Sequence, residues 1–577
     1  KSSAASDVYK RQELQDRKST CNTKYYFSRG QEKMIEKYYD GAIEQVAAGL
    51  GTVEKNHLLV RYSGQFSVEN LNDTKQLEKN EDIFVQVHEF ETGEITCAYE
   101  PYLTMICDGF RRYMTGTFEE FMETCDVYYL HRPVLLGYFN QDNTGREEII
   151  LLDEVAYEQE RMLAALERML CAIADRHPVL FVLNRFQLAS KSTMQLTARF
   201  LKCENCNIGL VLGVSDIQAM PEFLVPDWEM LYETLDDGSK IYHIGNSGRK
   251  KEETIDDEKY VDYGSEKVYR KLQNMVEFLD FDQAAYYLET IERKIKFDNL
   301  LVDDAARFRM WLLFVKVSIL RQDIPKALEI CEDLEKIHLA GKEEECAYEQ
   351  DYLIATAYMY QGKLKEALEM AGETYRIAGK MSDDYRMFLS ELLEAKIQMS
   401  GWYNIFFCAQ DVKIKESLIQ NLIRYNYRNH LAHVYIYAYD NKPEIVKKAN
   451  QSEELLIYFS RGIRIAKKLG NEYLINMAYQ KNIMLSSTNG MYEISLLYSV
   501  RTYEALKDKR SIQAGRIYSG IAYNLCAIGE NERAMAYYRH AIRLFYHLRE
   551  PEDIAEVQYN MSLNLSLIHI SEPTRRV

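Results

Sequence analysis

Basic charge, proline and long apolar runs are all scarce in this sequence. Its 71 lysines and arginines face 88 aspartates and glutamates, a net charge of -17, which argues against a general basic surface for gripping nucleic acid. No apolar run approaches the roughly 20 residues that span a bilayer, so we expect no membrane partner. Nine prolines in 577 residues favour long uninterrupted helices, because proline costs roughly 3 kcal/mol in a helix interior.

Metal-ligand spacings and disulfide patterns are also missing. The eleven cysteines are scattered, which suits a reducing compartment and therefore a cytoplasmic location. The single close pair, Cys203 and Cys206, lacks the second pair or nearby histidines that a zinc site needs. His430 and His433 lie three positions apart on an expected helix, where a core or surface role outweighs a ligand role. We expect no metal site and no cofactor.

Both ends of the sequence carry translations of one inverted DNA segment. The peptide DVYKRQ, residues 7–12, can be encoded by GATGTGTATAAGAGACAG, and the reverse complement of that string encodes LSLIHI, residues 565–570. The segment resembles the transposon end of sequencing-library adapters. We expect residues 1–12 and 565–577 to be adapter artefacts. The remaining length suggests roughly two to four domains.

From residue 265 onward, apolar residues recur at three- and four-residue steps, which predicts helix after helix. Two segments share one spacing of small, bulky and glycine positions. The first contains Ala355, Tyr358, Gly362, Ala367, Ala371 and Thr374, and the second contains Ala522, Leu525, Gly529, Ala534, Tyr538 and Ala541. Small residues let paired helices approach closely, and glycine supplies the left-handed turn that ends the first helix.

These positions resemble the tetratricopeptide family. Weaker copies place Ala284 and Ala327 in the slot of Ala367, about 40 residues apart against the family's usual ~34, which predicts longer helices. We therefore expect an all-α tetratricopeptide-type superhelix over residues 265–564. A non-repeating helical domain is the alternative.

The resemblance also implies a binding face. In this family, peptide contacts come from first-helix positions that point away from the packed seam, on the concave side of the superhelix. By register, these positions are Glu349, Tyr352, Thr356 and Met359 in the clearest repeat, and Arg516 in the last one. Ordinary solvated surface is the alternative for each of them.

Residues 13–248 have a different sequence pattern, in which short apolar runs alternate with amphipathic helical stretches, as in an α/β domain. Strands are expected at residues 57–62, within PVLFVLNRFQLAS, in IGLVLGVS and in KIYHIG. Helices are expected near residues 102–123 and 154–175. A charged linker, residues 249–264, then leads into the repeats.

This layout resembles the ATPase domain of the STAND class, including the large LuxR-type regulators in which that domain precedes helical repeats. The peptide FSRGQE, residues 27–32, resembles the Gly-Arg-Glu opening helix of the class. Residues 178–201 resemble its acidic-motif strand and following helix, and residues 207–216 occupy the place of its sensor strand. The resemblance implies a P-loop-NTPase-like fold.

The residues for nucleotide hydrolysis do not accompany this layout. A phosphate-binding loop needs glycines, a lysine and a hydroxyl. The first expected strand is instead followed by SGQFSVEN, in which only Gly64 and Ser67 remain as vestigial positions of such a loop. The acidic strand ends in Asn184 and Arg185 where the family has two acids, and Ser215 ends the sensor strand. We expect a pseudo-ATPase rather than an enzyme. A misplaced loop, or an anion bound by Arg185 without magnesium, remains open.

The sequence therefore predicts a non-catalytic signalling or transcription-regulatory protein whose repeats bind a peptide, a protein or a small ligand. DNA is an expected partner only through a C-terminal module that this sequence does not contain, and a homo-oligomer is left open. Two alternatives remain. One is a stand-alone tetratricopeptide scaffold for protein contacts, and the other is a divergent but active ATPase.

Overall fold

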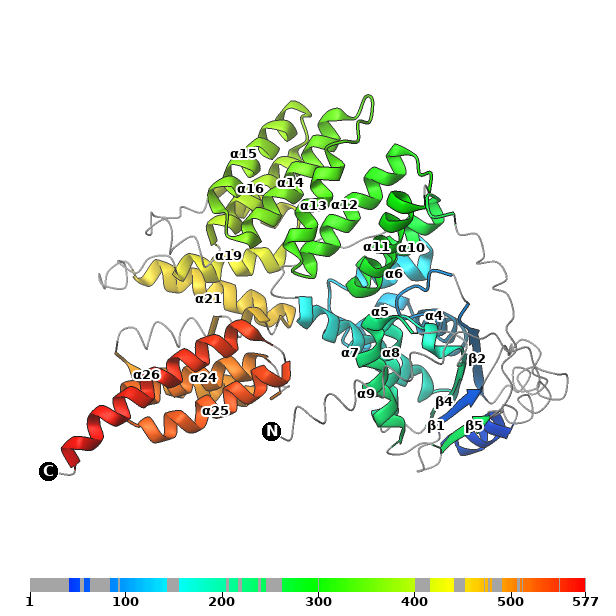
Figure 1. Ribbon diagram of the computed structural model, residues 1–577, viewed down its shortest axis with the longest axis horizontal. Helices are drawn as coiled ribbons and strands as arrows, with labels where there is room; N and C mark the ends of the chain where they lie inside the picture. Colours follow the sequence, from blue (N-terminus) through cyan, green and yellow to red (C-terminus); the bar gives the residue numbers. More distant parts are fainter. Residues whose placement is uncertain are drawn as a thin grey trace. The chain divides into compact units, whose positions relative to one another are not determined.

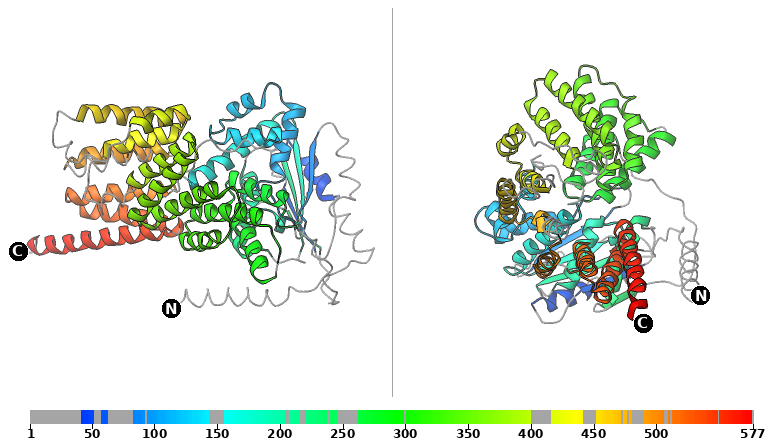
Figure 2. Two further views of the ribbon diagram at one scale, coloured as in Figure 1. Left: turned by 90° about the horizontal axis from the view of Figure 1, so that it is seen from above. Right: turned by 90° about the vertical axis from the view of Figure 1, so that its left-hand side faces the viewer.

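The computed structural model describes the chain in ranges interrupted by gaps (Figures 1 and 2). The chain divides into two compact units, residues 1–390 and 391–577. The described residues are 41–51, 57–62, 83–91, 94–142, 155–203, 207–215, 220–236, 240–244, 262–298, 300–399, 416–440, 452–471, 473–475, 478–479, 490–505, 509–510, 512–548 and 550–575.

A parallel five-stranded sheet organises the first unit, in the order β2-β3-β4-β1-β5. Both central strands β3 and β4 are buried along their whole length, as expected where helices cover both faces of a parallel sheet. The predictions of β1, β3, β4 and β5 are confirmed, whereas β2 was not predicted. The strands are β1 (His57–Tyr62), β2 (Phe84–Glu89), β3 (Val179–Asn184), β4 (Ile208–Ser215) and β5 (Lys240–Ile244).

Alternate side chains of the strands enter two apolar layers, because successive residues point to opposite faces. Leu58 and Val60 pack with a helical segment that includes Ile43. Leu59 packs on the other face, in a larger core that continues into the first repeats. The helices of this domain are α4 (Tyr102–Tyr113), α5 (Phe118–Thr124), α6 (Arg132–Asn140), α7 (Val155–Ala174), α8 (Lys191–Lys202) and α9 (Val225–Asp236), with 3-10 turns at Phe186–Leu188 and Glu222–Leu224.

The expected single helix over residues 102–123 is two helices, α4 and α5. Gly116 lies between them with a φ of 93°, a left-handed conformation that suits glycine. Thr117 then opens α5 with a capping box, since its side chain accepts from the Glu120 N–H and the Glu120 carboxylate accepts from the Thr117 N–H. The local capping signal therefore overrides the continuous apolar periodicity.

Helix pairs follow the sheet domain within the first unit, and α10, α12 and α14 pack successively against one another as the first helices of three pairs. The pairs are α10 (Glu266–Glu277) with α11 (Phe281–Phe297), α12 (Asp304–Leu320) with α13 (Ile324–Leu334), and α14 (Glu343–Gln361) with α15 (Leu364–Lys380). Helix α16 (Asp384–Met399) continues from them across the boundary between the units.

The second unit holds the later helices, including the predicted final repeat formed by α24 and α25. Its described helices are α18 (Glu416–Arg424), α19 (Arg428–Asp440), α21 (Ser452–Leu469), α23 (Tyr492–Ala505), α24 (Ile512–Ala527), α25 (Asn531–Leu548) and α26 (Pro551–Arg575). Helix α26 extends into residues 565–577, and the assignment of those residues to an adapter stays a prediction.

The repeat positions predicted from spacing form the seams of the helix pairs. Ala355 and Ala367 are fully buried where α14 meets α15, and Ala522 and Ala534 are fully buried where α24 meets α25. Gly362 ends α14 with a φ of 81°, which confirms its predicted turn. Helices α11, α12 and α15 have 17 residues each and α14 has 19, so longer helices account for the longer repeat.

Among the described helices, none is both long and apolar enough to cross a bilayer.

Candidate functional site

The last residues of β1 and β3, the two strands on either side of β4, meet at the carboxyl edge of the sheet. The Tyr62 hydroxyl, at the end of β1, donates a 2.7 Å hydrogen bond to Oδ1 of Asn184, at the end of β3. Asn184 is 0% exposed, and burial raises the pKa of Tyr62 well above its usual value. The Asn184 amide is therefore fixed by a neutral phenol in the place where the STAND resemblance implies a carboxylate.

Arg185 follows Asn184 and takes a left-handed conformation, with a φ of 53°. Its Nη2 atom lies 3.1 Å from Oε1 of Glu89, the last residue of β2, which is the register partner of Asn184. The ion pair is partly buried, so it is screened less than a surface pair. The cation thus occupies the edge of the sheet together with its own counter-ion.

Ser215 ends β4 at the same edge and is buried. Its backbone N–H donates a 3.2 Å hydrogen bond to Oε1 of Gln187, in the turn after β3. Gly64 and Ser67, the other predicted vestiges of the nucleotide site, lie outside the described residues. The structure thus brings Asn184, Arg185 and Ser215 to one edge of the sheet.

Sequence reasoning missed Tyr62 and Glu89 at this edge. Tyr62 ends a predicted strand, and the carboxyl ends of parallel strands share one edge, so this rule could have placed Tyr62 there. Glu89 ends β2, whose mostly half-buried residues gave no clear apolar run.

A second cluster joins the sheet domain to the first repeat. The N–H of Ser192, in the first turn of α8, donates a 3.0 Å hydrogen bond to Oδ2 of Asp280, just before α11. Asp280 is 3% exposed, and this burial raises the pKa of its carboxyl. The amide of Gln159, on α7, donates a 2.9 Å hydrogen bond to the carbonyl of Leu279. The turn between α10 and α11 is thus anchored to two helices of the sheet domain.

Ion pairs extend this junction into the second repeat. Lys191 contacts the Asp282 carboxylate and lies 4.0 Å from Asp227 on α9. Asp282 also accepts a 2.8 Å hydrogen bond from Nε of Arg321, which caps α12. Its two cations keep the pKa of Asp282 below its usual value despite burial, which acts in the opposite direction.

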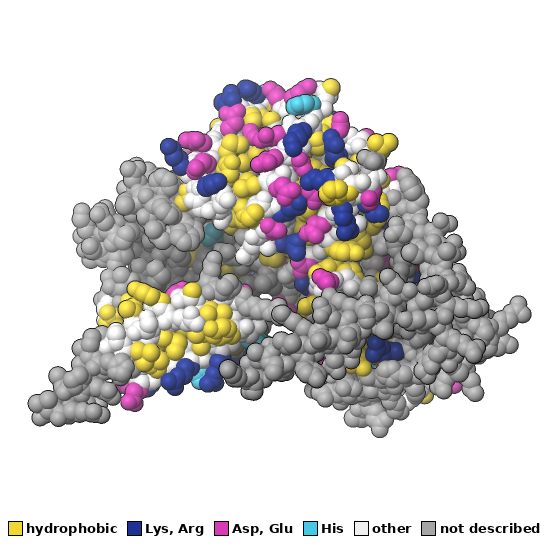
Figure 3. Space-filling view, in the orientation of Figure 1, with side chains coloured by type: hydrophobic (Ala, Val, Ile, Leu, Met, Phe, Trp, Pro, Cys, Tyr) yellow, Lys and Arg dark blue, Asp and Glu magenta, His cyan; other side chains and the backbone are white. Residues whose placement is uncertain are grey.

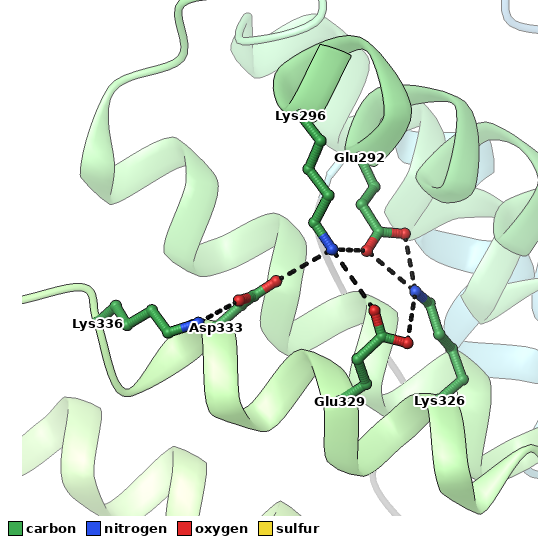
Figure 4. Close-up of polar contacts among 6 residues, drawn as sticks. All are labelled: Glu292, Lys296, Lys326, Glu329, Asp333 and Lys336. Carbon is green, nitrogen blue, oxygen red and sulfur yellow. Dashed lines mark hydrogen bonds and ion pairs between the residues drawn. The ribbon is translucent and has the colours of Figure 1, made fainter.

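The outer sides of α11 and α13 share a further network of acids and lysines (Figure 4). Glu292, only 7% exposed, accepts hydrogen bonds from Lys296 at 2.7 Å and from Lys326 at 3.0 Å. Lys296 also lies 3.4 Å from Asp333, which pairs with the exposed Lys336 at 2.7 Å. The network ties the second helices of consecutive pairs and has a structural role.

The predicted binding positions on α14 differ in how accessible they are. Glu349 pairs with Arg386 of α16 at 3.0 Å. Tyr352 is half-buried and stacks on Tyr348, with ring centroids 6.0 Å apart. The Thr356 hydroxyl donates to the Tyr352 carbonyl at 2.8 Å. These residues lie together on the first helix of the pair.

Two other predicted binding positions are engaged within the fold. Met359 is 7% exposed, so it is buried instead of lying on the open face that the register predicted, because helical register alone does not say which neighbour covers a position. In the second unit, Nε and Nη2 of Arg516 lie 3.0 and 3.2 Å from the two carboxylate oxygens of Asp553, on α26. Arg516 therefore fastens α24 to the last helix.

No group of three or more metal-ligating side chains occurs in the part of the chain that the structure describes. Cys203 lies 3.7 Å from Cys171 between their sulfur atoms, and Cys206 is outside the described residues. His430 is buried on α19 next to Tyr427, with ring centroids 5.5 Å apart. Acidic and basic side chains alternate over the repeats of the first unit on the face shown in Figure 3.

No protein-family model and no curated protein matches this chain. Among solved structures, a STAND protein with a tetratricopeptide repeat sensor from Pyrococcus horikoshii is 11% identical, covering 96% of this chain and 96% of that one, with a TM-score of 0.41. Rap protein complexed with competence and sporulation factor is 12% identical over 52% of this chain and 80% of its own, with a TM-score of 0.38. NprR in complex with its cognate peptide NprX is 14% identical over 52% and 88%, with a TM-score of 0.34. Each is a distant likeness.

Proposed function

We propose that this protein is a non-catalytic signalling or regulatory protein, whose helical array captures a peptide or protein and whose α/β domain receives the signal without hydrolysing nucleotide. The observation that carries the proposal is the pair Asn184 and Arg185 at the carboxyl edge of the sheet. Hydrolysis requires a bound magnesium ion and a positioned water. A guanidinium beside a neutral amide repels a divalent cation, and the Glu89 carboxylate is already paired with that guanidinium.

The junction supports the signalling part of the proposal. The first repeat is anchored to the N-terminus of α8 through Asp280 and Ser192, and α8 follows the strand that ends in Asn184. A rearrangement of the first helix pair therefore acts directly on the helix next to the nucleotide-like edge. Packed elements of this kind shift as rigid bodies between discrete arrangements, since their interiors resist continuous deformation.

Nucleotide binding by the full chain tests the non-catalytic part. We expect no saturable binding of ATP or GTP at millimolar concentration in calorimetry, with or without magnesium, and no phosphate release above background. Magnesium-dependent binding would instead establish the divergent ATPase. Nucleotide binding that is independent of magnesium and abolished by Arg185→Ala would establish an anion site at Arg185.

Partner capture tests the binding part. Charge reversal by Glu349→Lys on the first helix α14 is expected to weaken capture of a partner, while the melting temperature falls only slightly, because the ion pair with Arg386 is only partly buried and such a pair near the surface contributes about 1 kcal/mol. The matched control is Glu366→Lys, an exposed position on the second helix α15. Equal loss of capture in both variants would contradict a binding role for the first-helix face.

The transcription-regulatory form of the proposal needs a DNA-binding module outside this sequence. Reading the source gene across the junction after residue 564 tests it. A basic helix-turn-helix following the repeats supports a transcription regulator, and a stop codon within one further helix supports the stand-alone scaffold.

A further inference from the structure

Two cysteine side chains meet at the end of the sheet domain opposite to Asn184. Helix α7 leads into β3 and helix α8 leads into β4, so each helix ends where its strand begins, because a crossover helix returns the chain to the start of the next parallel strand. Cys171 lies in the last turn of α7, and Cys203 caps the end of α8. The two helices lie side by side (Figure 1), and the Sγ atoms are 3.7 Å apart.

This separation is one that a disulfide bond can close. A disulfide has an S–S distance of about 2.05 Å, so the two sulfurs must approach one another by about 1.7 Å. Cys203 has an extended backbone, with a φ of -65° and a ψ of 140°, so its side chain lies outside the regular turns of α8 and can rotate without displacing them. Both cysteines are partly exposed, so a small reagent can reach them.

The thiol of Cys171 holds its proton more strongly than an ordinary cysteine does. Burial, followed by the neighbouring sulfur of Cys203, raises the pKa of Cys171, and the carboxylates of Glu167 and Asp175 act in the same direction. The thiolate is the nucleophile in exchange with a disulfide. The first attack therefore comes from Cys203, and Cys171 reacts in a second step.

We propose that Cys171 and Cys203 form a thiol–disulfide exchange site that takes a low-molecular-weight disulfide as its oxidant. The Cys203 thiolate attacks one sulfur of the reagent, the reagent S–S bond breaks, and one reagent thiolate leaves and takes up the proton that Cys203 lost. The mixed disulfide on Cys203 carries no charge, so it no longer opposes ionisation of Cys171.

The second step completes the exchange. The Cys171 thiolate attacks Sγ of Cys203, the mixed disulfide breaks, and the second reagent thiolate leaves with the proton of Cys171. Two protein thiols are thus oxidised to one disulfide, and one reagent disulfide is reduced to two thiols. In a reducing compartment such a bond is transient and forms when the proportion of oxidised reagent rises.

The disulfide joins the two helices that hold the first repeat. Gln159, on α7, and Ser192, on α8, both bond to the turn between α10 and α11. A covalent bond between α7 and α8 fixes these two anchors relative to one another, and it stabilises the fold because a crosslink restricts the unfolded chain. The consequence for signalling rests on the proposed function, whereas the exchange chemistry does not.

Equilibration of the reduced full chain with an excess of glutathione disulfide tests the proposal. Mass spectrometry after alkylation of the remaining thiols should find, in more than half of the chains, the peptide with Cys171 linked to the peptide with Cys203. The linked chain should melt several degrees higher than the reduced chain. Cys171→Ser and Cys203→Ser should each lose the link and the shift. Cys346→Ser, another partly exposed cysteine, on α14, is the matched control and should keep both.

Cys206 needs a variant of its own, because trypsin leaves Cys203 and Cys206 in one peptide, between Lys202 and Lys240. In Cys206→Ser, the link to Cys171 must persist. A link from Cys203 to Cys206, a disulfide between two chains, a glutathione adduct that never resolves, or no loss of thiols would each overturn the proposal. An unshifted melting temperature in the linked chain would overturn its stabilising effect.

The linked peptides are identified in the unaltered chain, so the test does not depend on the folding of any variant. None of these results involves capture of a partner or binding of nucleotide. Failure of the exchange site therefore leaves the proposed function to its own experiments, and failure of the proposed function leaves the exchange site in place.

Discussion

The backbone N–H of Ser192, in the sheet domain, donates a 3.0 Å hydrogen bond to Oδ2 of Asp280, in the first helix pair. Ser192 lies in the first turn of α8, whose N-terminal N–H groups have no intrahelical acceptors. Asp280 opens α11 in the first repeat. A carboxylate from the array therefore completes the cap of a helix in the sheet domain, with the favourable sign for a helix N-terminus.

Removal of this acceptor should destabilise the first unit. Asp280→Ala leaves the buried Ser192 N–H unpaired, so we expect a loss of about 2–3 kcal/mol in the free energy of unfolding. Because burial raises the pKa of this carboxyl, the neutral isostere Asp280→Asn should lose less than half as much. Urea unfolding of the full chain measures both variants.

The control for Asp280 is Asp304→Ala, an exposed acid in the first turn of α12. It should change the free energy of unfolding by no more than about 0.5 kcal/mol. Equal losses for the Asn and Ala variants of Asp280 would show that its charge, and not its acceptor oxygen, holds the junction.

Asp351, on α14, should make stability depend on pH. Burial, with smaller contributions from the nearby carboxylates of Glu373 and Glu335, raises the pKa of Asp351 to about 6. Between its ordinary unfolded value and about 6, the folded state binds a proton that the unfolded state does not. Stability therefore falls as pH rises through that window, and the whole cost is present above it.

Asp351→Asn should consequently stabilise the protein at pH 8 by about 1–2 kcal/mol, after allowance for solvent screening. The gain should shrink at pH 5 and vanish below about pH 4. Urea unfolding across this pH range measures it. Glu369→Gln, an exposed acid on α15, serves as the control and should show no such profile.

The seam between α14 and α15 should not tolerate a larger side chain at Ala367. This residue is fully buried, and a leucine there forces the two helices apart. Ala367→Leu should cost about 1–3 kcal/mol. Ala305→Leu, at an exposed position in the first turn of α12, makes the same chemical change with nearly equal helix propensity and should be near neutral in thermal unfolding.

Glu292 should dominate the network between α11 and α13 (Figure 4). Glu292 is 7% exposed and its carboxylate bonds to both Lys296 and Lys326, so Glu292→Gln should cost about 1–3 kcal/mol, a loss only partly reduced in 1 M salt. Lys336→Met should cost less than about 1 kcal/mol, since its side chain is 70% exposed. Similar losses in denaturant unfolding would show that the network acts only at the surface.

The repeat geometry could be predicted closely because its causes are local. Gly362 and Ala367 are recognisable from spacing, since the turn requires a left-handed residue and the seam requires a small one. The place of Asn184 at the end of a strand followed from the end of an apolar run. Met359 could not be placed in this way, because helical register gives a direction, while burial depends on which neighbour covers that direction.

The sequence by itself determined most of the strands, the helical repeats and the glycine turns within them, and that Asn184 and Arg185 stand at the end of the apolar run that forms β3, but it did not reveal β2 or the break between α4 and α5. Only the tertiary structure decided which polar groups bond to one another. Tyr62 and Asn184 are 122 positions apart, and Ser192 and Asp280 are 88 positions apart. No local pattern relates residues at such separations, because their meeting depends on how whole strands and helices pack.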